Sequence, residues 1–170
     1  CPVLVSLTFE ETGRTLYGTD PKTAVIVLQS LGADAVGMNC SVGPDRMAEQ
    51  VKAMYEAANV PILVKPNAGM PKLLNGVTQY DMHPQEFAES VKKLSECGAR
   101  IFGGCCGTTP AHIQAMAELL KDAPLSPVLT ERRRFLASER RSIQIDPDGP
   151  FTVVGERINP TGKKKLQAAL

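Results

Sequence analysis

The feature that most constrains the fold of this chain is a strand-then-helix pattern that occurs four times in residues 1–121. In each unit a short apolar, β-branched run precedes a helix whose apolar residues recur at steps of three and four. Each helix is expected to begin at a proline, because the N–H that proline lacks has no partner there. The predicted strands are 3–9, 33–40, 61–65 and 99–103, and the predicted helices begin at Pro21, Pro44, Pro84 and Pro110.

Four βα units in series predict a parallel sheet with helices packed outside it. An open doubly wound sheet and a (β/α)8 TIM barrel both have this pattern. The barrel is favoured because polar residues follow successive strands at their C-terminal ends, where barrel enzymes hold their active sites. A barrel needs eight units, so we expect α/β architecture comprising the C-terminal half of a TIM barrel. Its last helix is expected to turn Ile113, Ala117 and Leu120 inward.

The composition changes after residue 121. Residues 122–150 hold four prolines and two arginine clusters, which predicts an interdomain linker with one short helix at 131–140. Residues 151–155 have a new strand pattern, and a helix is expected to start at Lys164. We therefore expect a barrel half at 1–121, a linker at 122–150, and the first strand of a second barrel in 151–170. Since both ends interrupt apolar patterns, we expect a fragment whose N-terminal barrel half is missing.

Composition excludes several classes of function. The net charge of +1 and an aromatic content of 5% without tryptophan give no basis for binding nucleic acid. Apolar runs are far shorter than the ~20 residues of a membrane span. Five cysteines, an odd number, do not suit a secreted disulfide scaffold, and no signal peptide is visible. We therefore expect a reduced, cytoplasmic protein that binds neither membranes nor nucleic acid.

Three cysteines carry the chemistry. Cys40 ends the second predicted strand, and Cys105 and Cys106 follow the fourth, so all three are expected at one rim of a parallel sheet. Three thiolates without an obvious fourth ligand suit tetrahedral Zn²⁺ with one open position. Alternatively, each is a small buried apolar residue, or Cys105 and Cys106 form a redox-active vicinal disulfide. His83 and His112 are expected to serve the first turns of their helices rather than to bind metal.

Three sequence segments carry a resemblance to a known family. They are Gly-Met-Asn-Cys at 37–40, Lys-Pro-Asn-Ala-Gly at 65–69 and Gly-Gly-Cys-Cys-Gly-Thr-Thr-Pro-Ala-His at 103–112. Over residues 1–121 they resemble the homocysteine S-methyltransferase family. The resemblance implies that Cys40, Cys105 and Cys106 bind zinc, and that the zinc binds the sulfur of homocysteine.

The C-terminal segment carries a second resemblance. Val-Gly-Glu-Arg-Ile-Asn-Pro-Thr-Gly at 154–162 is similar to the start of the pterin-binding barrel in cobalamin-dependent members of the family. This implies that a methyl group passes from methyltetrahydrofolate through cobalamin to homocysteine, giving methionine. It also implies that Asn159 bonds the folate ring, and that downstream pterin and cobalamin domains complete the enzyme. The alternatives are a single-step homocysteine S-methyltransferase with another methyl donor, and a zinc-stabilised fragment without catalytic activity.

Other polar residues at the predicted strand ends are candidates for substrate binding. Asn67 is either the fourth metal ligand, part of the amino-acid pocket, or a turn residue. The N–H groups of Gly103 and Gly104 are candidates for binding the substrate carboxylate, and Glu10 for pairing with its ammonium. Lys65 at a strand end raises a competing hypothesis, a Schiff-base aldolase, which leaves the three cysteines unexplained.

Overall fold

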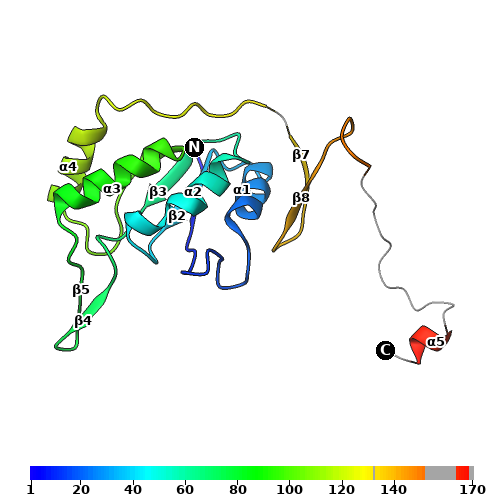
Figure 1. Cartoon of the computed structure of the whole chain (residues 1–170), viewed down its shortest axis with the longest axis horizontal. Helices are drawn as coiled ribbons and strands as arrows, with labels where there is room; N and C mark the ends of the chain where they lie inside the picture. Colours follow the sequence, from blue (N-terminus) through cyan, green and yellow to red (C-terminus); the bar gives the residue numbers. More distant parts are fainter. Residues whose placement is uncertain (132, 152–163, 169–170) are drawn as a thin grey trace.

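The parallel sheet expected from the repeated units is present. The structure, a computed structural model, describes residues 1–131, 133–151 and 164–168. Four parallel strands pair in the order β1-β2-β3-β6 (Figure 1). These strands are β1 (Leu4–Leu7), β2 (Ala35–Asn39), β3 (Ile62–Lys65) and β6 (Ala99–Phe102). The helices are α1 (Pro21–Ser30), α2 (Ala48–Tyr55), α3 (Pro84–Glu96) and α4 (Pro110–Leu120).

The helix starts follow the prolines with one exception. Asp20 caps α1 by accepting a hydrogen bond of 2.8 Å from the backbone N–H of Thr23. Proline is likewise the first residue of α3 and α4. At Pro44 the chain instead forms a 3-10 turn over Pro44–Arg46, and α2 begins only at Ala48. The predicted start of this helix is therefore wrong by one turn, whereas the apolar residues Met47, Val51 and Met54, spaced at three and four, are buried.

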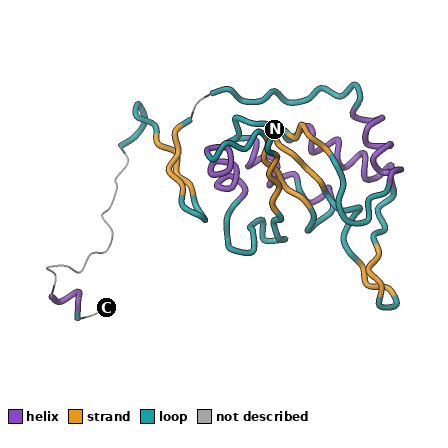
Figure 2. The backbone as a smooth tube through the Cα atoms, turned by 180° about the vertical axis from the view of Figure 1, so that it is seen from behind, coloured by secondary structure: helices purple, strands orange, loops and turns teal. Residues whose placement is uncertain are grey.

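The helices α1, α2 and α3 lie on the same face of the sheet, which Figure 2 shows from behind. The core between them is apolar and includes the fully buried side chains Val25, Val36, Met54, Val64 and Leu94. A doubly wound sheet would carry helices on both faces, whereas a barrel wall has them outside only. The arrangement therefore favours a barrel wall.

The inward face of α4 differs from the prediction. Ile113 is 39% exposed and Ala117 is exposed, while His112 and Met116 are buried. The reason is that α4 packs on α3, where Met116 joins a small apolar cluster with Phe87 and other α3 residues. The prediction counted only apolar residues as inward, and it therefore missed His112, which is buried next to the exposed Ile113.

A hairpin interrupts the βα pattern between β3 and α3. It consists of β4 (Lys72–Leu74) and β5 (Val77–Gln79), which pair antiparallel. The turn between them is Asn75–Gly76, with φ angles of 51° and 78°. Asn-Gly with both residues at positive φ is the turn that matches strand twist in tight hairpins. This signal was present in the sequence, although no strand was predicted in this region.

The region after residue 121 contains strands instead of the expected helix. β7 (Arg134–Ala137) and β8 (Ser142–Ile145) form an antiparallel hairpin. Its turn closes where the N–H of Ser138 donates to the carbonyl of Arg141 at 2.8 Å. The hairpin contacts α1, because the Thr23 hydroxyl donates to that of Ser142 at 3.1 Å and Lys22 lies over the Phe135 ring. The helix expected at 131–140 is therefore wrong.

Residues 123–131, here called the strap, run along the edge of the sheet where the strands begin (Figure 1). Asn59, just before β3, donates from Nδ2 to the carbonyls of Leu129 at 2.9 Å and Glu131 at 2.8 Å. The Tyr55 hydroxyl donates to the carbonyl of Pro127 at 2.9 Å. The strap is therefore attached through its backbone to the end of α2 and to the loop before β3.

Two expectations concern the C-terminal segment. The short helix α5 (Lys164–Gln167) begins at the predicted residue. The strand expected at 151–155 and the candidate Asn159 lie outside the described residues. Within the described part of the chain, none of the helices is long and apolar enough to cross a membrane.

The attachment of the strap yields a first prediction. Asn59→Asp keeps the shape of the side chain but replaces the donor amide with an acceptor that faces two carbonyls. We expect the free energy of unfolding to fall by about 1 kcal/mol and cleavage of residues 123–131 by elastase to accelerate. Gln79→Glu, the same change on exposed β5, is the control. Equal proteolysis of the two variants would contradict the role of Asn59.

Candidate metal centre

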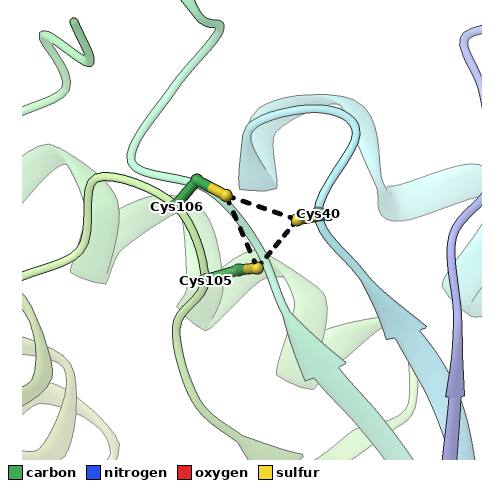
Figure 3. A group of neighbouring side chains, drawn as sticks. All are labelled: Cys40, Cys105 and Cys106. Atoms are coloured by element: carbon green, nitrogen blue, oxygen red, sulfur yellow. Dashed lines mark hydrogen bonds between the residues drawn. The ribbon is translucent and has the colours of Figure 1, made fainter. Parts of the chain in front are cut away.

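Three cysteine side chains converge at the C-terminal ends of the strands. Cys40 directly follows β2, while Cys105 and Cys106 lie in the loop between β6 and α4 (Figure 3). The Cys40 Sγ lies 2.8 Å from that of Cys105 and 3.5 Å from that of Cys106, and the third separation is 3.9 Å. Cys40 and Cys105 are half-buried and Cys106 is exposed, so the group is open to solvent on one side. The predicted convergence is confirmed.

The end of β3 holds both cysteine loops in place. On one side, the N–H of Cys40 donates to the Lys65 carbonyl at 3.0 Å. On the other side, the N–H of Cys105 donates to the Pro66 carbonyl at 2.9 Å, and that of Cys106 to Asn67 Oδ1 at 3.2 Å. Consecutive residues of one segment therefore position all three thiols.

The backbone at Cys40 is unusual. Cys40 and Ser41 have φ angles of 57° and 64°, a left-handed conformation that only glycine adopts without strain. Two successive residues of this kind turn the chain sharply after β2. The turn leaves the Cys40 thiol facing the other two cysteines (Figure 3). Strain of this kind persists where the surrounding structure imposes it, and it concentrates at functional sites.

The three sulfurs fit a tetrahedral metal ion. Zinc–thiolate bonds of about 2.3 Å place neighbouring sulfurs about 3.8 Å apart. The separations of 3.5 and 3.9 Å are close to this value, and the Cys40–Cys105 pair would open by about 1 Å to match it. Among the described residues this is the group of cysteine, histidine and acidic side chains that can hold a metal ion. Sulfur ligands favour zinc over hard cations such as Mg²⁺.

The thiols of the group ionise unequally. Burial opposes ionisation of Cys40, but hydrogen bonds from the thiols of Cys105 and Cys106 outweigh it and lower the pKa of Cys40. Burial and the hydrogen bond to Cys40 raise the pKa of Cys105 to about 11. A thiolate at Cys40 is thus stabilised by its neighbours, whereas ionisation of Cys105 is opposed.

The other predicted site residues are placed differently. Asn67 is buried beside the cysteines, where its side chain accepts the Cys106 N–H. The N–H of Gly103 donates to the Val64 carbonyl in the sheet, so it is occupied and does not face a ligand. Glu10 is exposed and lines a separate cavity of about 210 Å³ with Phe9 and Arg46, at the end of β1.

Tyr80 is a site residue that sequence reasoning did not identify. It follows β5, and burial together with interaction with the Cys106 thiol raises the pKa of its hydroxyl. Its ring lies against Gly107, where an added Cβ would come within 2.4 Å of the tyrosine side chain. The positive φ of Gly107, 78°, also requires glycine. The Asn75–Gly76 dipeptide predicts the hairpin that precedes Tyr80, and it was the sequence signal from which this segment could have been recognised.

Comparison with known proteins agrees with the geometry. Residues 1–120 match the family described as homocysteine S-methyltransferase. The chain is 34% identical over 170 residues to methionine synthase of Mycobacterium tuberculosis and 33% identical over 175 residues to that of Mycobacterium leprae. It covers only 14% of the length of either relative.

A solved structure is also similar. The metallated form of the homocysteine methyltransferase MmuM from Escherichia coli superposes with a TM-score of 0.54 at 25% sequence identity. The match covers 69% of this chain and 35% of the other. The similar structure is thus one determined with metal.

The unequal ionisation predicts unequal reactivity in the metal-free chain. At pH 8, a thiol with a pKa of about 11 is almost entirely protonated, while Cys40 has its pKa lowered and supplies the thiolate. We expect iodoacetamide to alkylate Cys40 several-fold faster than Cys105, with the difference shrinking as the pH approaches 11. Peptide mass spectrometry after timed quenching measures both rates. Faster labelling of Cys105 at pH 8 would contradict this assignment.

The strained turn predicts a stabilising substitution. Ser41→Gly removes a Cβ from a left-handed residue, and we expect the free energy of unfolding to rise by about 1 kcal/mol. Ser90→Gly, the same change inside α3, should lower it by a similar amount. Denaturant titration measures both variants. A loss of stability in Ser41→Gly would show that the serine side chain, rather than the backbone, determines this turn.

Proposed function

Because the chain belongs to the homocysteine S-methyltransferase family, we propose that it supplies the zinc-binding part of a barrel in which the thiol of homocysteine is methylated to methionine. The observation that carries this proposal is the convergence of the Cys40, Cys105 and Cys106 thiols at one edge of a parallel sheet. In this proposal the four units form the C-terminal half of a TIM barrel. Family membership gives no support to a Schiff-base aldolase at Lys65.

The donor set suits activation of a thiol. When bound, zinc would act as a Lewis acid that favours the thiolate form of homocysteine at neutral pH. Three cysteine thiolates leave the occupied site with a formal charge of −1, so a substrate thiolate there stays electron-rich and nucleophilic. A site of three neutral histidines would withdraw more charge and suit water activation. Three cysteine ligands therefore favour activation of a thiol substrate over activation of water.

The residues around the cysteines have proposed roles in binding the amino acid. Asn67 holds the Cys106 loop by accepting the Cys106 N–H, and its side chain is proposed as a fourth ligand when substrate is absent. Of the two glycines expected to bind the substrate carboxylate, Gly104 is the one proposed for it, because the N–H of Gly103 is bonded within the sheet. Glu10 is proposed to pair with the substrate ammonium from the rim beside β1.

The methyl donor is proposed to be methyltetrahydrofolate, delivered through cobalamin. The support is that similarity to the methionine synthases covers 99% of this chain, including the residues beyond the family match at 1–120. Folate and cobalamin would be bound by domains outside this chain, and Asn159 would contribute to the folate site. A cytoplasmic location, where thiols stay reduced, suits this chemistry.

Zinc binding provides the test of the proposal. We expect the full chain to bind one equivalent of Zn²⁺, and Cys106→Ala to weaken binding by more than roughly 100-fold, because two thiolates hold the ion poorly. Competition with a chromophoric chelator measures the affinity. Cys97→Ala, the same change at the C-cap of α3, should leave it unaltered. Tight stoichiometric zinc in Cys106→Ala would overturn the three-thiolate site.

Homocysteine distinguishes an enzyme from a structural zinc module. In X-ray absorption, we expect the zinc of the full chain to show three sulfur ligands and one lighter ligand, and four sulfur ligands when homocysteine is added. The added sulfur would be that of the substrate in the open position. An unchanged sulfur count at saturating homocysteine would favour the zinc-stabilised, non-catalytic alternative.

A further inference from the structure

His112 connects the first turn of α4 to the segment that precedes α3. The residue is 6% exposed, and both ring nitrogens have polar partners. Nε2 lies 2.9 Å from the carbonyl oxygen of Met82. Nδ1 lies 3.2 Å from the backbone nitrogen of Thr109 and 2.8 Å from its hydroxyl oxygen. With both nitrogens engaged, His112 is not available as a metal ligand.

The partners define the protonation of the ring. A carbonyl oxygen only accepts hydrogen bonds, so Nε2 of His112 carries the hydrogen and donates to Met82. Nδ1 is then the acceptor of the neutral ring, and it receives the N–H of Thr109. The edge-to-face contact with Phe87, with ring centroids 5.4 Å apart, fixes the ring plane. The ring therefore has one orientation and one tautomer.

The hydrogen bond to Met82 continues to the cysteine loop. The N–H of Met82 donates to the carbonyl of Ala68 at 3.2 Å, and the N–H of Ala68 donates to the carbonyl of Cys106 at 2.9 Å. These three bonds, from His112 through Met82 and Ala68 to Cys106, are here called the relay. The Cys106 N–H is held by Asn67 on the same segment. Both peptide groups of Cys106 are thus positioned by residues that the relay supports.

We propose that His112 is a positioning residue for the metal site, which holds Cys106 in place through the backbone of Met82 and Ala68. This inference rests on the proposed metal site and adds a residue to it. Cys106 is the exposed member of the cysteine group, and its loop contains Gly107, so its position depends on such neighbours. Groups behind metal ligands typically change metal affinity by 10- to 100-fold.

The competing explanation is that His112 only caps α4. Two substitutions separate the explanations, because each preserves one of the two ring functions. His112→Asn places an acceptor near the position of Nδ1 and retains the cap, but the new side chain is too short to reach the carbonyl of Met82. His112→Gln places a donor near the position of Nε2 and retains the relay, but it provides no acceptor at the cap.

The experiment measures zinc affinity and the absorption spectrum of the Co²⁺-substituted chain for wild type, His112→Asn and His112→Gln. We expect His112→Asn to weaken zinc binding on the order of 10- to 100-fold and to alter the sulfur-to-cobalt charge-transfer bands. His112→Gln should stay close to wild type in both measurements. Thr23→Val, which removes a buried hydrogen-bonding hydroxyl from α1, is the control for lost stability.

The outcomes distinguish the relay from the proposed function. Equal zinc affinity in His112→Asn and wild type, or an equal loss in both His112 variants and in Thr23→Val, would overturn the positioning role. Amide exchange at Ala68 and Met82 in the metal-free chain gives a readout that needs no zinc, and we expect it to accelerate in His112→Asn only. Slow exchange there in every variant would also overturn the relay, whereas a wild-type chain without zinc affinity would overturn the metal site itself.

Discussion

Parallel pairing of β2, β3 and β6 is the constraint on which the site depends. Asn39 pairs with Lys65, and Val64 with Phe102, so the three strands end at one edge of the sheet. Residues 65 positions apart in the chain therefore meet at that edge. β3 contributes no thiol, but the residues after it bond to the loops on both sides. The middle strand thus acts as the template on which the cysteines of its neighbours are aligned.

Charge explains why such a group needs a cation. Three thiolates within 4 Å of one another repel strongly. The protein lowers the pKa of Cys40 and raises that of Cys105, so in the metal-free group Cys105 keeps its proton when Cys40 has lost its own. Binding a divalent ion releases those protons and removes the repulsion. The preference for a soft cation follows from the ligands, and the open side leaves room for a thiol substrate.

The fold was largely predictable where local and global signals agree. Proline at the helix starts and apolar periodicity located the βα units, and the cysteine motifs located the group of three thiols. Prediction failed where tertiary contacts decide. The arginine-rich segment forms a hairpin, because β7 and β8 pair with each other and contact α1. In α4, His112 is buried because both nitrogens of its ring have hydrogen-bond partners. Gly103 was assigned from its place at a strand end, which does not reveal that its N–H donates to the Val64 carbonyl within the sheet.

The strap has a mechanical consequence. Its contacts with Asn59, Tyr55 and Arg100 lie where the strands begin, whereas the cysteines lie where the strands end. Tension along the strap is therefore borne by the end of α2, by Asn59 and by the start of β6, at the opposite end of the sheet from the thiols. The strap thus follows one edge of the sheet and leaves the edge that carries the thiols uncovered.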